Sequence, residues 1–112
     1  MINFFILYIM GWIYLLNEAD TQNYKIGVTK SKTIDRRKLT LQTGNASELI
    51  LCFKFETPHP YRLEKMLHNH YSNKRLVGEW FELTDSEALC FRNICNKFSN
   101  IVDFLKKENK FF

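Results

Sequence analysis

Cysteine, proline and glycine are all scarce in this chain of 112 residues, which contains three, two and four of them. The odd number of cysteines, with no C-x-x-C pair, excludes a disulfide framework and a cysteine-rich zinc site. We therefore expect Cys52, Cys90 and Cys95 to be reduced thiols in the core of an intracellular protein. No internal repeat or low-complexity linker occurs either, so one domain with a helical tail is the simplest division.

The chain also lacks a hydrophobic run long enough to span a bilayer. Residues 1–16 are almost wholly apolar, but a spanning helix needs ~20 residues, and Asn3 and Gly11 interrupt the run. The run has neither the basic start nor the small-residue cleavage site of a signal peptide. We expect a protein of the cytoplasm or nucleus that is neither secreted nor anchored in a membrane. Residues 1–10 are assigned to an apolar N-terminal extension, and either Met1 or Met10 is the start.

Hydrophobic residues are abundant, at 46% of the chain with 15% aromatic, which excludes wholesale disorder. The formal net charge is +4. Six basic residues fall within 14 positions, opposed only by Asp35: Lys25, Lys30, Lys32, Arg36, Arg37 and Lys38. Such a cluster can meet several phosphates at once, with an affinity that depends on salt. On composition alone, a solvated helix face is the simpler explanation.

Apolar periodicity and turn residues predict an α+β domain, in which helices flank a small antiparallel sheet of about three to four strands. We expect strands over residues 12–16, 24–29, 48–56 and 79–83, and helices over 33–42, 60–71 and from 85 onward. The first two strands flank a polar loop and should form a hairpin. Thr84 and Glu87 match a capping box that opens the last helix. The GIY-YIG-like domain named below is assigned to residues 11–85, and the C-terminal helix and tail to 86–112.

A phenol, cations and a carboxylate are distributed over these elements. Tyr14 lies on the first strand and Lys25 on the second, so the hairpin allows the phenol and the ammonium to approach each other at the sheet surface. Arg36 and Arg37 begin the next helix, and Glu64 comes from a separate one. Phosphodiester hydrolysis needs a group that readies the nucleophile, cations that neutralise phosphoryl oxygens and a carboxylate that holds a metal. By itself, a residue such as Tyr14 is more often part of a core.

Five motifs follow one another with consistent gaps. They are G-W-I-Y at 11–14, Y-K-I-G at 24–27, R-K-L-T-L-Q-T-G-N at 37–45, E-K-M-L-H at 64–68 and G-E-W-F at 78–81. Together they resemble the GIY-YIG nuclease superfamily. Within it they look like the phage- and virus-rich branch, known from a phage T-five open reading frame and from a meiotically up-regulated fungal protein. The resemblance covers about residues 11 to 85, and it implies an endonuclease or DNA-binding domain.

The resemblance implies a role for each matching residue. Tyr14 corresponds to the tyrosine that accepts the proton of the attacking water or positions it. Lys25 stands where many members carry the tyrosine of the second motif. Arg37 corresponds to the arginine that holds the scissile phosphate, or Arg36 does if the preceding loop is one residue shorter. Glu64 corresponds to the single metal-binding residue, which implies one Mg²⁺ or Mn²⁺ ion.

Other residues near these motifs have more than one interpretation. His68, one helical turn after Glu64, is placed in the site, where it hydrogen-bonds the carboxylate, touches the phosphate or packs. Gly27 permits a close approach at the strand end. Glu79 either lies near Lys25 or Arg37 or is a plain surface charge. Nucleic-acid binding is assigned to Lys30, Lys32, Arg36 and Lys38.

The leading hypothesis is a metal-dependent endonuclease that binds nucleic acid, expected to be DNA, and uses no small-molecule cofactor. The alternative is a DNA-binding module of the same fold that does not cut. Glu64 favours catalysis, because a carboxylate that faces a polyanion repels it unless a metal ion lies between them. A membrane-tethered or interaction protein that uses residues 1–16 is the third hypothesis.

Overall fold

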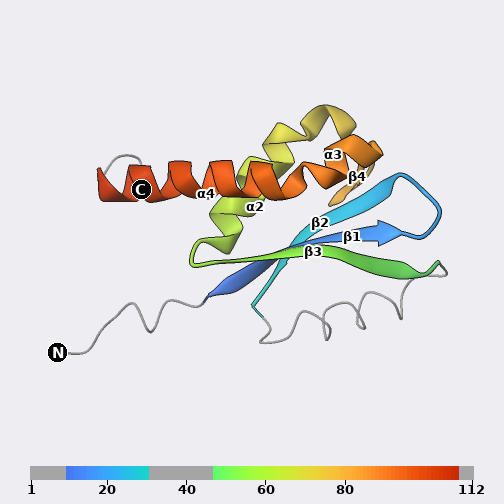
Figure 1. Cartoon of the computed structure of the whole chain (residues 1–112), viewed down its shortest axis with the longest axis horizontal. Coiled ribbons are helices and arrows are strands. Elements are labelled where there is room, and N and C mark those ends of the chain that lie inside the picture. The colour runs from blue at the N-terminus through green and yellow to red at the C-terminus, as the bar shows by residue number, and fades with distance from the viewer. Residues whose placement is uncertain (1–9, 31–46, 109–112) are drawn as a thin grey trace.

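The computed structural model describes residues 10–30 and 47–108, and its centre is an antiparallel sheet (Figure 1). The strands are β1 (Gly11–Glu18), β2 (Asn23–Thr29), β3 (Leu49–Thr57) and β4 (Trp80–Glu82), in the order β3-β1-β2-β4. The helices are α2 (Pro60–His70), the 3-10 turn η2 (Ser72–Lys74), α3 (Asp85–Leu89) and α4 (Phe91–Lys107). The expected α+β class is confirmed. The helix expected over residues 33–42 lies outside the described residues.

Polar side chains close the hairpin between β1 and β2, as the polar loop in the sequence predicted. The Asn17 side-chain amide donates hydrogen bonds to the carbonyl oxygens of Thr21 and Asn23, both at 3.1 Å. The Asn23 amide donates in turn to Glu18 Oε1 at 3.0 Å. These bonds fix the turn, and the pairing that follows places Tyr14 opposite Gly27.

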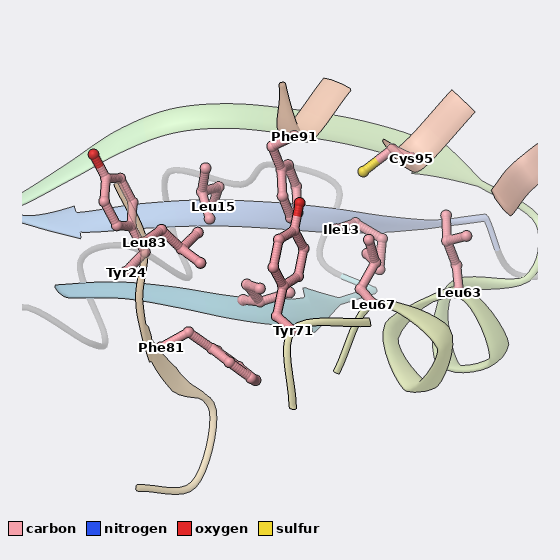
Figure 2. Close-up of a cluster of buried hydrophobic side chains, with 11 residues drawn as sticks. Ile13, Leu15, Tyr24, Leu63, Leu67, Tyr71, Phe81, Leu83, Phe91 and Cys95 are labelled. Carbon is pink, nitrogen blue, oxygen red and sulfur yellow. The ribbon is translucent and has the colours of Figure 1, made fainter. Parts of the chain in front are cut away.

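The two faces of the sheet carry separate apolar clusters. On the helix face, Ile13 and Leu15 of β1 pack with Leu63 and Leu67 of α2 and with Phe91 of α4 (Figure 2). Figure 1 shows α2 and α4 on this same side of the sheet. The opposite face, called the second face below, holds a smaller cluster of Tyr14, Leu16 and Leu49, with Trp12, Leu51 and Trp80 against it. Each face of β1 is therefore covered, which explains why so many of its residues are buried.

A β-bulge divides the apolar residues of β3 between the two faces. Simple alternation would place Leu49, Leu51, Phe53 and Phe55 on one face. The pairing with β1 instead shifts between Leu15 and Leu16, which leaves Cys52 as the extra residue. The two phenylalanines therefore pack on the helix face and the two leucines on the second face.

The helices begin where the sequence predicted, but the last one is divided. Pro60 occupies the first turn of α2. The capping box of α3 is present, with Thr84 Oγ1 accepting from the Glu87 amide at 3.1 Å and Glu87 Oε1 from the Thr84 amide at 2.9 Å. A break at Cys90 separates α3 from α4 and lets Phe91 enter the core. Among the described helices, none combines the length and the apolar character that a bilayer crossing requires.

The expectation of three core thiols is wrong for two of them. Cys52 and Cys90 are exposed, because the first lies in the bulge and the second at the helix break. Cys95 is buried in the helix-face core, and this burial raises the pKa of its thiol to about 12. All three are free thiols.

Candidate active site

Tyr14 and Lys25 project from neighbouring strands onto the same face of the sheet. Tyr14 is opposite Gly27, and Leu16 is opposite Lys25. Because side chains alternate with a period of two, Tyr14, Lys25 and Gly27 all belong to the second face. The hairpin therefore brings the phenol and the ammonium to one side of β1 and β2, as the spacing of the two residues predicted.

The Tyr14 ring lies directly over the backbone of Gly27. Tyr14 is fully buried, with an exposed fraction of 0%. A Cβ atom added to Gly27 would overlap the Tyr14 hydroxyl and lie 2.9 Å from Cε1. The absence of a side chain at Gly27 is what allows the phenol to occupy this position. The sequence indicated a close approach at this glycine, and the structure identifies the group that approaches.

Lys25 is held in place by an acid and an aromatic ring from β4 and the turn before it. Its Nζ atom lies 3.2 Å from Glu79 Oε1 and 5.7 Å from the centroid of the Trp80 ring. Only 13% of the Lys25 side chain is exposed. The Ile26 amide donates to the Glu79 carbonyl at 3.0 Å, so the backbone also holds this acid beside β2. Of the interpretations of Glu79, the structure supports the one that places it near Lys25.

Glu64 and His68 lie together on α2, next to the edge of β2. His68 Nε2 is 3.9 Å from Glu64 Oε2 and 2.9 Å from the Ile26 carbonyl oxygen. A carbonyl oxygen only accepts hydrogen bonds, so Nε2 carries the proton and donates it. This nitrogen is therefore not available as a metal ligand or as a base. His68 attaches α2 to β2, and its ring packs at 5.1 Å from the ring of Phe81.

The described part of the site converges on residues 25–27 of β2. Lys25 contributes its ammonium, the Ile26 carbonyl binds His68, and Gly27 carries the Tyr14 ring. The same His68 Nε2 atom lies 3.9 Å from Glu64 Oε2, so the Glu64 carboxylate lies beside this backbone segment as well. Three elements, β1, β2 and α2, thus supply a phenol, an ammonium and a carboxylate to a single stretch of backbone.

Of the five basic residues named between the second and third strands, the structure describes only Lys30. Lys32, Arg36, Arg37 and Lys38 lie outside the described residues. Lys30 directly follows β2, and its Nζ atom lies 5.1 Å from the centroid of the Tyr61 ring on α2.

Lys54 is a cation of the second face that the sequence interpretation missed. It is opposite Tyr14 on β3, and its Nζ atom lies 5.1 Å from the centroid of the Trp12 ring. The bulge at Cys52 determines this face, because a regular strand would have placed Lys54 on the face opposite to Leu49 and Leu51. A basic residue between two phenylalanines was the available signal in the sequence.

The donor groups fit a divalent ion that the protein holds through few ligands. Within residues 10–30 and 47–108, no group of three or more histidine, cysteine, aspartate or glutamate side chains is arranged to hold a metal ion. Glu64 offers carboxylate oxygens, which hard ions such as Mg²⁺ prefer, and Mg²⁺ commonly keeps several waters and binds substrate phosphates. Among the described residues, the Glu64 carboxylate therefore fits an ion that the protein holds loosely.

One comparison with known proteins gives a match. The family model described as T5orf172 domain matches residues 11–96, which is well over half of the chain. The matched range includes all the site residues described above. Neither the curated proteins nor the solved structures that were compared match the chain.

Proposed function

Because the chain belongs to the T5orf172 domain family, a branch of the GIY-YIG nuclease superfamily, we propose that it is a metal-dependent endonuclease of the cell interior. Its substrate is nucleic acid, expected to be DNA, and its reaction is the hydrolysis of a phosphodiester bond. The observation that carries the proposal is the convergence of Tyr14, Lys25 and Glu64 on residues 25–27 of β2. The family itself is one of nuclease and DNA-binding domains.

Each side chain has a part in this reaction that suits its chemistry. Tyr14 accepts the proton of the attacking water or fixes the position of that water, and its burial holds the phenol in one orientation. Lys25 and Arg37 neutralise the charge that builds on the phosphoryl oxygens. Glu64 would hold Mg²⁺ or Mn²⁺ through its carboxylate oxygens. When bound, that ion stabilises the negative charge on the leaving oxygen.

His68 supports the site without touching the reacting atoms. Its Nε2–H donates to the Ile26 carbonyl at 2.9 Å, and the same nitrogen lies 3.9 Å from Glu64 Oε2. His68 therefore sets the position of α2, and with it the carboxylate, relative to β2. We assign it as a positioning residue.

The binding module that does not cut is the second candidate, and the position of Glu64 argues against it. A binder needs only cations, and Lys25, Lys30 and Lys54 supply them without help from a carboxylate. An acid that is only 16% exposed, set beside the strand that carries Lys25, opposes phosphate binding unless a cation joins the two. Catalysis gives this acid a purpose that binding alone does not.

A nuclease assay on a panel of substrates tests the proposal. Purified protein is incubated with labelled single-stranded, duplex and branched DNA and with RNA, each with Mg²⁺, with Mn²⁺ and with a chelator. We expect cleavage of at least one substrate in the presence of metal and none with the chelator. Binding without cleavage of any substrate would assign the protein to the second candidate, and an absence of binding would contradict both.

A further inference from the structure

An exposed aromatic ring with a cation beside it lies on the same helix as Glu64. Tyr61 of α2 is 57% exposed. The Nζ atom of Lys30, which follows β2, lies 5.1 Å from the centroid of its ring. Large aromatic side chains usually bury most of their surface, so one that stays in water beside an ammonium is suited to a ligand with a flat face and a negative charge.

The position of Tyr61 is tied to the candidate active site. Tyr61 precedes Glu64 by three residues, so the two side chains emerge from one side of α2. The start of this helix is seated on the sheet, because a Cβ atom added to Gly11 would lie only 2.6 Å from Pro60 Cγ. The ring is therefore carried by a rigid element at a fixed place beside the carboxylate.

We propose that Tyr61 and Lys30 form a stacking platform for an unpaired nucleobase next to the phosphate that is cleaved. The proposal rests on the proposed function and names the substrate class: nucleic acid with at least one unpaired base at the cleavage position. The base stacks on the phenol ring, and the Lys30 ammonium pairs with a phosphate of the same segment. Stacking on an aromatic side chain tolerates any base, because every base has a π face.

The surroundings of the platform favour a nucleic acid as its occupant. The helix that carries Tyr61 also carries Arg62 and Lys65, and Glu64 is its only acidic residue. A base inside a duplex has both faces covered by its neighbours, and an exposed ring can stack only on a base that is flipped out, terminal or single-stranded. The platform therefore distinguishes unpaired substrates from continuous duplex.

The chain offers a matched control in Phe104 of α4. Its exposed fraction is 58%, almost the same as that of Tyr61. Within the ranges that the structure describes, no cation lies over the Phe104 ring. Phe104→Leu therefore measures how the loss of an exposed aromatic ring without a neighbouring cation affects nucleic-acid binding.

The test measures binding in a chelator, so that cleavage does not interfere. Fluorescence anisotropy with a labelled single-stranded oligonucleotide, and with a duplex of the same sequence, compares wild type, Tyr61→Leu, Tyr61→Phe and Phe104→Leu. We expect Tyr61→Leu to weaken single-strand binding by roughly 10- to 100-fold and to leave duplex binding unchanged. Tyr61→Phe keeps the ring and should keep the affinity, and Phe104→Leu should behave as wild type.

Two results would overturn the proposal. One is single-strand affinity that Tyr61→Leu does not change, and the other is an equal loss for single strand and duplex, which would indicate a general electrostatic or folding effect. Circular dichroism of each variant separates misfolding from lost contacts. If the wild type itself binds no nucleic acid, the proposed function fails and the platform with it, whereas failure of the Tyr61 variant alone leaves the nuclease proposal standing.

Discussion

Gly27→Ala tests whether the position of the Tyr14 ring requires a residue without a side chain at position 27. The added methyl group would overlap the Tyr14 hydroxyl and lie 2.9 Å from Cε1. Tyr14 is fully buried, so its ring cannot swing into solvent to make room. Overpacking of a core typically lowers the free energy of unfolding by about 1–3 kcal/mol. Because the methyl group meets a rigid ring, we expect the clash alone to cost an amount in the upper part of that range.

An opposing effect reduces the expected loss. Replacing glycine restricts the unfolded chain and raises stability by about 0.4–1 kcal/mol where the backbone conformation is compatible. The clash is the larger of the two contributions, so we expect Gly27→Ala to lower the free energy of unfolding by about 2 kcal/mol. Urea denaturation followed by circular dichroism measures this as a lower midpoint with an unchanged slope.

A second variant shows whether the tyrosine is the cause. Tyr14→Leu removes the atoms that the new methyl group would meet, whereas Tyr14→Phe keeps most of the ring in place. Gly27→Ala should therefore be much less destabilising when added to Tyr14→Leu than when added to wild type, with a coupling energy of about 1 kcal/mol or more. An equal loss in both backgrounds, or no loss in wild type, would refute the contact between Tyr14 and Gly27.

Three further changes have expected outcomes. Thr84→Ala removes an acceptor from the capping box of α3 and should lower the free energy of unfolding by about 1 kcal/mol; an unchanged urea midpoint would contradict this. Glu79→Gln removes the carboxylate 3.2 Å from Lys25 Nζ, and we expect a loss of up to about 1 kcal/mol because Glu79 is 39% exposed and solvent screens the pair. The exposed Glu82 is the control, and Glu82→Gln should change nothing. Burial, followed by nearby charges, lowers the pKa of His59, so the unfolded chain takes up this proton at a higher pH than the folded protein does. Stability should therefore fall as the pH drops below about 6.5, and His59→Gln should flatten this part of the pH profile; a profile with the same slope would exclude His59 as its source.

Local patterns in the sequence predicted most of the elements. A short apolar and aromatic run marked β1, and the polar loop after it marked the hairpin with β2. The proline at position 60 and the capping box at Thr84 marked helix starts, since these signals act within a few residues. The division of β3 between two faces was not predictable from alternation, because the bulge at Cys52 arises from pairing with β1. The break at Cys90 has no glycine or proline to indicate it, and the apolar spacing continues across it.

The same distinction holds for the candidate site. The shared face of Tyr14 and Lys25 follows from counting along a hairpin, so it was predictable once the two strands were recognised. The contact of His68 with the Ile26 carbonyl depends on where α2 meets the edge of β2, and the choice of Glu79 as the partner of Lys25 depends on β4. The spacing of residues within one helix or strand therefore predicts neither the His68–Ile26 hydrogen bond nor the Lys25–Glu79 ion pair.

Metal-dependent cleavage by Glu64→Ala shows most directly whether the Glu64 carboxylate is needed for hydrolysis of the phosphodiester bond. Single-turnover cleavage with Mg²⁺ or Mn²⁺ and substrate affinity in a chelator are measured on the same preparations, with Glu82→Ala as the control for loss of an acid. We predict that Glu64→Ala abolishes cleavage, leaves substrate affinity largely intact and keeps the fold, and that the control cleaves as wild type does. Cleavage that persists without the Glu64 carboxylate would contradict the account, as would cleavage and affinity that are lost together.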